Sequence, residues 1–146
     1  MFRRRMIWSI CLFLTTCGQE TQEILRSQTP ADAAILEVTP GPTYQFDAQT
    51  ALNSTSHLFT VTNRGKKAAT EISSDFYLSI TFTYQGGYPG ADGTCGVQLE
   101  PGASCTVRVT FTPQYVGDFE QILRVGYNNG YTQSLTDFPI LRGRGF

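Results

Sequence analysis

The sequence of 146 residues is poor in the side chains that most often carry out catalysis, because it contains only one histidine. A Ser-His-acid triad would have to use His57, which lies inside a strand-like stretch. The G-x-S-x-G pattern of a nucleophile elbow is also absent, and Ser104 stands between Ala103 and Cys105 at the start of another such stretch. The sequence therefore indicates no catalytic residue, and a small hydrolase is the least favoured function.

Clusters of acidic residues are also missing. The twelve acidic side chains are scattered singly, so no pair of carboxylates for glycoside hydrolysis stands out. Asp92 and Gly93 form a dipeptide typical of a turn, and no loop carries the alternating Asp and Asn ligands of a calcium site. We expect no metal ion and no cofactor.

Long apolar runs are lacking too, because the longest, Met6–Leu14, has nine residues. A helix needs roughly 20 residues to cross a bilayer, so this run after Arg3–Arg5 indicates a removed export signal instead. The segment Leu14–Gly18 then resembles the lipobox of bacterial lipoproteins, which implies a signal peptide over residues 1–16 and acylation of Cys17. Ordinary secretion by cleavage nearby is the alternative. Gly18 is not the aspartate associated with inner-membrane retention, which favours the outer membrane of a bacterial envelope.

Without residues 1–16 the chain has eight basic and twelve acidic side chains, a net charge of −4. This balance argues against nucleic-acid binding, which would need a basic stripe. It also argues against electrostatic attraction to anionic membranes, so the membrane contact would come from the acyl chain.

The four cysteines divide into separate roles. Cys11 leaves with the signal and Cys17 accepts the lipid, which leaves Cys95 and Cys105 as a pair in an oxidising compartment. A disulfide would stabilise the domain by about 2–3 kcal/mol on the chain-entropy model. Zinc is the rival interpretation, but the spacing lacks a C-x-x-C pair and His57 is the single histidine available.

The remaining chain divides into a tether, 17–33, and a strand-rich domain, 34–146. The tether is rich in Gln, Thr and Glu and shows no sustained apolar period. The domain predicts about seven short strands separated by Gly and Pro, which is typical of a β-sandwich. The expected strands are Ile35–Thr39, Tyr44–Asp47, His57–Asn63, Phe76–Tyr84, Cys105–Phe111, Asp118–Tyr127 and Thr132–Arg142.

The segment Cys95–Pro113 is the most informative of these. Cys105, Val107, Val109 and Phe111 alternate with Thr106, Arg108, Thr110 and Thr112, which predicts a strand with one buried and one wet face. Pro101-Gly102 predicts a turn before it, and the cysteine pair would clamp the hairpin that leads into the strand.

Three segments together resemble a known family: Leu58–Gly65, Cys95–Pro113 and Phe138–Gly145. They are similar to the F-x-V-x-N-x-G, C-G-x-x-L-x-P-G-x-S-C-x-V-x-V-x-F-x-P and x-P-L-x-G-x-G patterns of bacterial choice-of-anchor D domains, relatives of ASH/Hydin and major-sperm-protein modules. The resemblance covers residues 34–146. It implies an immunoglobulin-like sandwich of seven to eight antiparallel strands with Greek-key connections, a Cys95–Cys105 disulfide, and a role in surface or assembly scaffolding without catalysis.

Two loops carry tyrosines that are candidates for binding. Tyr84 and Tyr88 lie in or beside the Gly-rich loop Gln85–Gly93, and Tyr127 and Tyr131 flank Asn129-Gly130, which predicts a primed hairpin turn. We expect a lipid-anchored envelope protein that binds another envelope or surface protein. A carbohydrate-binding domain that uses these tyrosines to hold a glycan is the alternative.

Overall fold

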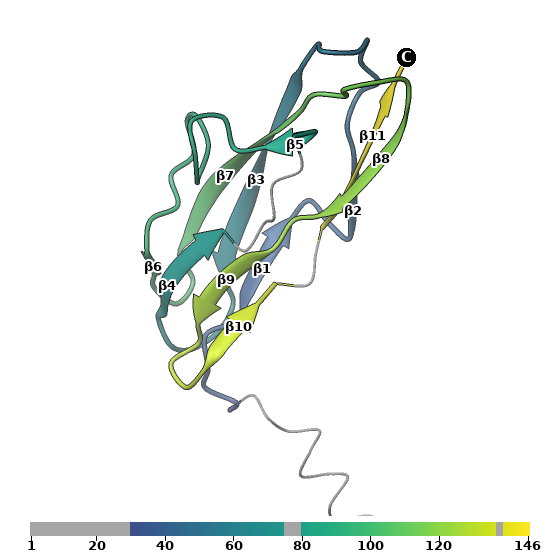
Figure 1. Cartoon of the computed structure of the whole chain (residues 1–146). Coiled ribbons are helices and arrows are strands. Elements are labelled where there is room, and N and C mark those ends of the chain that lie inside the picture. Colours follow the sequence, from purple (N-terminus) through teal and green to yellow (C-terminus); the bar gives the residue numbers. More distant parts are fainter. Residues whose placement is uncertain (1–29, 75–79, 137–138) are drawn as a thin grey trace, which may run out of the picture. The chain divides into compact units, whose positions relative to one another are not determined.

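The computed structural model describes residues 30–74, 80–136 and 139–146, and every element in these ranges is a β-strand. Three sheets are formed (Figure 1). The first has the order β1 (Leu36–Thr39), β3 (Thr55–Asn63), β7 (Ser104–Phe111) and β5 (Phe82–Thr83). The second has the order β10 (Gln133–Leu135), β9 (Val125–Asn128), β4 (Ala69–Ser74) and β6 (Gln98–Leu99). The third has the order β2 (Thr43–Gln45), β11 (Ile140–Gly145) and β8 (Gly117–Ile122).

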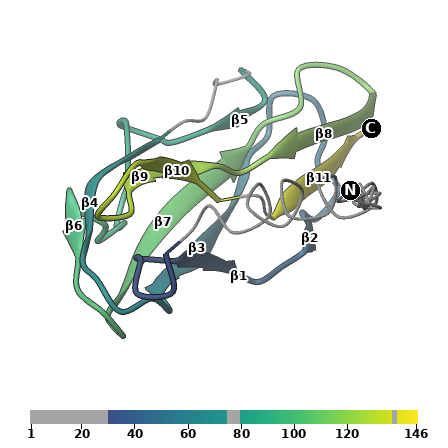
Figure 2. The same cartoon turned by 90° about the horizontal axis from the view of Figure 1, so that it is seen from below.

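The sheets bury one common core, as an immunoglobulin-like β-sandwich requires. Figure 2 shows β7, β3 and β1 in one layer, with β9 and β4 in the layer that faces it. The rings of Phe46, Phe59, Phe82 and Phe111 meet between the layers, with centroids 5.0–6.4 Å apart. Burying each of these rings stabilises the fold by roughly 1.5–3 kcal/mol relative to exposure. The predicted fold class is therefore confirmed.

The strand β7 follows the alternation predicted from the sequence except at Thr110. Cys105, Val107, Val109 and Phe111 are buried and Thr106 and Arg108 are only partly covered, but Thr110, predicted on the wet face, is 8% exposed. The strands β3 and β7 pair antiparallel from Thr55↔Phe111 to Thr62↔Ser104.

Other predicted strands are divided or shifted. The stretch Asp118–Tyr127 forms two strands in different sheets, since β8 ends at Ile122 and pairs with β11, whereas β9 begins at Val125 and pairs with β4 and β10. The stretch Thr132–Arg142 likewise divides into β10 and β11, with Pro139 between them. The chain therefore has more and shorter strands than expected, and β2 pairs with β11 in parallel.

Two further expectations need correction. The strand β4 was not predicted, because its sequence Ala-Thr-Glu-Ile-Ser-Ser lacks a clear alternation. Of the expected strand Phe76–Tyr84, residues 76–79 lie outside the described residues, and only Phe82–Thr83 are paired. Phe82 is buried as the pattern predicts, but Ile80 is 72% exposed.

Candidate interaction surface at the β1 edge

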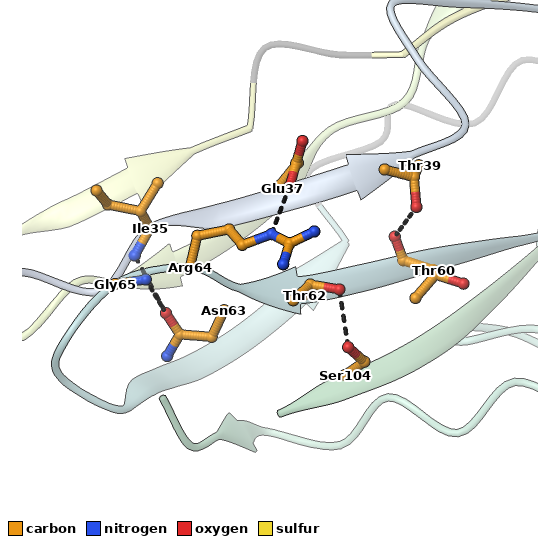
Figure 3. A network of polar contacts seen from close by, with 9 residues as sticks. All are labelled: Ile35, Glu37, Thr39, Thr60, Thr62, Asn63, Arg64, Gly65 and Ser104. Carbon is orange, nitrogen blue, oxygen red and sulfur yellow. Dashed lines mark hydrogen bonds and ion pairs between the residues drawn. The ribbon is translucent and has the colours of Figure 1, made fainter. Parts of the chain in front are cut away.

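The strand β1 forms one edge of its sheet, and a dense network of polar contacts surrounds it (Figure 3). Within the part of the chain that the structure describes, β1 pairs with β3 alone, from Leu36↔Asn63 to Thr39↔Thr60. Its opposite side faces an open groove of about 630 Å³. The groove is lined by Ile35, Leu36, Glu37, Val38, Gly41, Pro42, Arg64 and Thr136.

Asn63, at the end of β3, holds this edge in place. Its side chain is fully buried, and its Oδ1 accepts hydrogen bonds from the N–H groups of Ile35 (3.3 Å) and Gly65 (3.0 Å). Its Nδ2 donates to the carbonyl oxygens of Lys67 (2.7 Å) and Leu99 (3.0 Å). One amide thus satisfies backbone groups of the residue before β1, of the turn after β3 and of β6. An apolar side chain could not form these hydrogen bonds.

Gly65 is needed here for space rather than for a left-handed backbone. Gly65 is not among the residues with positive φ. A Cβ atom at position 65 would instead lie 2.2 Å from the Ala33 carbonyl oxygen and 2.5 Å from the Ile35 nitrogen. The chain entering β1 therefore passes directly over this glycine.

The outer face of β1 and β3 carries polar side chains, and these largely pair with one another. Arg64 Nε donates to Glu37 Oε2 at 2.7 Å, and both side chains remain at least half exposed. Hydroxyl groups line the same face, where Thr62 contacts Ser104 at 2.8 Å (Figure 3). An exposed ion pair of this kind adds little to stability, about 0–1 kcal/mol.

The predicted disulfide is present between Cys95 and Cys105, with Cα atoms 4.8 Å apart. The predicted turn is also present, since Ala103 N–H donates to the Glu100 carbonyl oxygen and Gly102 has φ of +77°. The segment is not a hairpin, however, because β6 pairs with β4 and β7 pairs with β3 and β5. The disulfide therefore ties a crossover between two sheets.

The tyrosines near the Gly-rich loop do not form an exposed surface. Tyr84 is 5% exposed, and Tyr88 packs edge-on against it with ring centroids 5.4 Å apart. Burial raises the pKa of Tyr88 to about 12. This corrects the expectation that these two rings are available to a ligand, because the loop folds back and both join the core.

The second pair of tyrosines is also divided. Tyr127 is 6% exposed, and its hydroxyl accepts a hydrogen bond from the Leu36 N–H at 3.3 Å. Tyr131 is exposed, its hydroxyl donates to the Asp32 carboxylate at 2.8 Å, and the Lys67 ammonium lies 3.7 Å from its ring centroid. The hydrogen bond from Tyr131 holds the pKa of Asp32 below its usual value. A sugar-stacking pair of Tyr127 and Tyr131 is therefore not formed.

A two-residue primed turn was predicted between these tyrosines, and this type of turn is wrong. Asn128 pairs with Gln133, which leaves a four-residue loop in which Gly130 alone has positive φ. The Asn129 Oδ1 accepts from the N–H groups of Tyr131 and Thr132 and so shapes the loop. The predicted β-hairpin itself is present.

His57 has a structural environment that the sequence did not reveal. Its ring stacks on Tyr44 with centroids 4.0 Å apart, and Tyr44 Oη lies 2.8 Å from His57 Nδ1. Burial, and then the charge of Arg108, lower the pKa of His57. Burial, followed by the charge of Asp47, raises the pKa of Tyr44, whose hydroxyl shares a hydrogen bond with the imidazole ring.

The predicted signal, Cys17 and most of the tether lie outside the described residues. The residues that are described include no helix long and apolar enough to span a membrane. Among these same residues, no three His, Cys, Asp or Glu side chains are grouped so that they could hold a metal ion.

The all-β fold is that of an immunoglobulin-like domain. Residues 34–137 match the model of the HYDIN/CFA65/VesB-like, Ig-like domain, and the chain belongs to this family. No curated protein matches the sequence of this chain.

Solved structures show the same fold at low sequence identity. The ASH/PapD-like domain 7 of human CEP192 is 17% identical with a TM-score of 0.56, and the match covers 82% of this chain and 91% of that domain. The VesB protease of Vibrio cholerae is 20% identical with a TM-score of 0.52, over 75% of this chain and 31% of VesB. A protein of unknown function from Porphyromonas gingivalis W83 is 11% identical with a TM-score of 0.53, over 82% and 50% of the two chains.

Proposed function

We propose that this chain is a protein-interaction module without catalytic activity, held at a bacterial envelope membrane by a lipid on Cys17. The observation that carries the interaction role is the open edge of β1 with the groove of about 630 Å³ beside it. Loops and edges on a rigid sandwich are where binding is usually placed. Membership of an Ig-like domain family supports the same conclusion.

The lipid anchor is supported by the sequence of the amino-terminal segment. Arg3–Arg5, the short apolar run and Leu14–Cys17 follow the order of a lipoprotein signal. The net charge of −4 after residue 16 provides no electrostatic attraction to an anionic membrane, so an acyl chain would supply the attachment.

Metabolic labelling with an alkyne fatty acid tests the anchor. We expect label on the wild-type chain, none on Cys17→Ser, and unchanged label on Cys11→Ser, a matched control within the signal. Label that survives Cys17→Ser would overturn the assignment of Cys17.

Photo-crosslinking in intact cells tests the interaction role. A photoreactive phenylalanine is placed at Ile35, beside the groove, and at Leu52, ahead of β3; these residues are 48% and 71% exposed. We expect a crosslinked protein of defined mass from at least one position. If these and the other exposed positions of the domain yield no crosslinked protein, the interaction role is wrong.

A further inference from the structure

A second groove lies between β5 and β8, at the edge of the first sheet opposite to β1. This β5–β8 groove has a volume of about 350 Å³ and is open to solvent. Its lining combines the exposed ring of Tyr115 with the polar residues Thr81, Gln114, Glu120 and Gln121. Pockets of this size that pair aromatic rings with a few polar groups are typical of ligand sites.

Tyr115 is held in a fixed position although it is 65% exposed. Its ring packs against Phe119 with centroids 5.0 Å apart. Its carbonyl oxygen packs against the backbone of Gly145 in β11, where a Cβ atom would lie 2.3 Å from that oxygen, so only glycine allows this approach. A ring that is fixed in advance loses little conformational entropy when a ligand covers it.

The polar groups around this ring are also held. The Gln114 Nε2 donates to the Thr112 carbonyl oxygen at 3.0 Å, and the Thr112 N–H donates to the Thr81 carbonyl oxygen at 2.7 Å. These two bonds orient the Gln114 amide and join the two sides of the groove. Glu120 Oε2 accepts a hydrogen bond from Arg142 Nε at 2.8 Å. Because an amide both donates and accepts and a carboxylate accepts, the lining bonds to hydroxyl groups in both directions.

The charges of the groove favour a neutral ligand. Glu120 is the one charged side chain among the residues that line it, and its ion pair with Arg142 offsets that charge. An anionic ligand would therefore meet a carboxylate rather than an unpaired cation, and a cationic ligand would have to compete with Arg142 for Glu120.

A neutral sugar has the matching chemistry. The C–H groups on the face of a pyranose ring pack on an aromatic ring, whose face is negative, while the hydroxyl groups at its rim form hydrogen bonds. We propose that the β5–β8 groove binds a neutral oligosaccharide, with one sugar ring stacked on Tyr115 and its hydroxyls bonded to Gln114 and Glu120. This site is separate from the β1 edge and goes beyond the proposed interaction role.

A proline-rich peptide fits this groove less well. Such peptides dock in grooves lined by several accessible aromatic rings. Of the three rings in the β5–β8 groove, Phe82 is 1% exposed and Phe119 packs against the core, so Tyr115 alone is mostly exposed. One exposed ring surrounded by fixed hydrogen-bonding groups suits a single stacked sugar better than a row of prolines.

Titration of the isotope-labelled full-length chain with cellotetraose tests the proposal. We expect the sugar at millimolar concentration to shift the amide resonances of Gln114–Gln121, and the ring current of Tyr115 to move sugar C–H resonances upfield. Tetragalacturonate, which carries a carboxylate on each ring, is the matched probe and should leave these resonances unchanged.

Variants of the ring separate stacking from other contacts. Tyr115→Ala should weaken cellotetraose binding about tenfold, whereas Tyr115→Phe, which keeps the ring, should bind nearly as well as the wild type. Tyr131→Ala removes another exposed tyrosine, 52% exposed in the loop between β9 and β10, and should leave binding unchanged.

A second pair of variants tests the polar groups without touching Tyr115. Gln114→Leu removes the amide and should weaken binding severalfold, because the sugar hydroxyl that it bonds loses its partner. Gln98→Leu, at an exposed glutamine of β6, is the control and should bind as the wild type does.

The proposal is overturned if cellotetraose causes no shift, if its shifts lie outside Gln114–Gln121, or if Tyr115→Ala binds as tightly as the wild type. Equal binding of tetragalacturonate overturns it as well. An acetylated hexaproline peptide that shifts Gln114–Gln121 when cellotetraose does not would make the groove a peptide site instead. Photo-crosslinking through Ile35 tests the interaction role independently of all these outcomes.

Discussion

The side-chain amide of Asn63 donates a hydrogen bond to the Leu99 carbonyl oxygen at 3.0 Å and so joins the end of β3 to β6 in another sheet. The same amide receives the Ile35 N–H, which places the start of β1. Asn63 therefore acts as a buried polar junction, and its removal would leave several backbone groups without partners.

We expect Asn63→Ala to lower the free energy of unfolding by roughly 3 kcal/mol or more, because buried groups left unpaired each cost about 1–3 kcal/mol. Urea denaturation followed by fluorescence measures the change. Asn53→Ala is the matched control, since the Asn53 side chain is exposed and its amide donates to the Thr50 hydroxyl. Similar midpoints for the two variants would contradict the role of Asn63.

Gly65→Ala should destabilise the domain by about 2–3 kcal/mol, because the added Cβ overlaps backbone atoms that cannot move independently of β1. Gly96→Ala is the control, since no atom lies within 4 Å of its Cβ position and its φ is not positive. Thermal unfolding of both variants checks the prediction. A loss of stability in Gly96→Ala equal to that in Gly65→Ala would show that close approach is not the cause.

The sequence predicted the long, regular parts of this fold and missed the irregular ones. The alternation in β7 identified its apolar buried face, although Thr110 on the other face is buried as well. The strand β4 was missed since it bends, with a register shift between Thr70 and Ser73 and positive φ at Glu71. The division of Asp118–Tyr127 between two sheets depends on tertiary pairing, which a continuous apolar pattern does not report.

The candidate site was predicted less well than the fold. Tyrosine in a Gly-rich loop indicated exposure, yet Tyr84 and Tyr88 fold into the core. The F-x-V-x-N-x-G pattern contained both Asn63 and Gly65, but it did not show that the asparagine reaches Leu99 or that the glycine passes beneath Ala33. Both relations join segments far apart in sequence.

The Cys95–Cys105 disulfide should stabilise the domain by about 2–3 kcal/mol, as expected for a loop of this length on the chain-entropy model. The double variant Cys95→Ser, Cys105→Ser should unfold at correspondingly lower urea concentration than the oxidised wild type. Intact mass with and without reduction should differ by the mass of two hydrogen atoms in the wild type. An unchanged mass would mean that the purified protein lacks the bond.

Stability should fall as the pH drops below the ordinary histidine pKa of 6.5, because the pKa of His57 is lowered in the folded domain. In this window the unfolded chain binds a proton that the folded chain does not, so stability rises with pH. The loss should continue until the pH passes the folded pKa of His57. Since His57 is the single histidine of the sequence, His57→Gln should flatten the melting temperature between pH 7 and 5. An unchanged slope would assign the dependence to other groups.

Tyr127→Phe should cost about 1 kcal/mol, because it removes one hydrogen bond to the Leu36 N–H and leaves the ring in the core. The local effect is more informative than the global one. Hydrogen exchange at Leu36 should accelerate by more than the loss of global stability explains, since this N–H then faces the groove without a partner. Tyr131→Phe is the control, because its hydroxyl contacts Asp32 on the surface and leaves Leu36 untouched. Equal exchange at Leu36 in the two variants would show that Tyr127 does not cover the β1 edge.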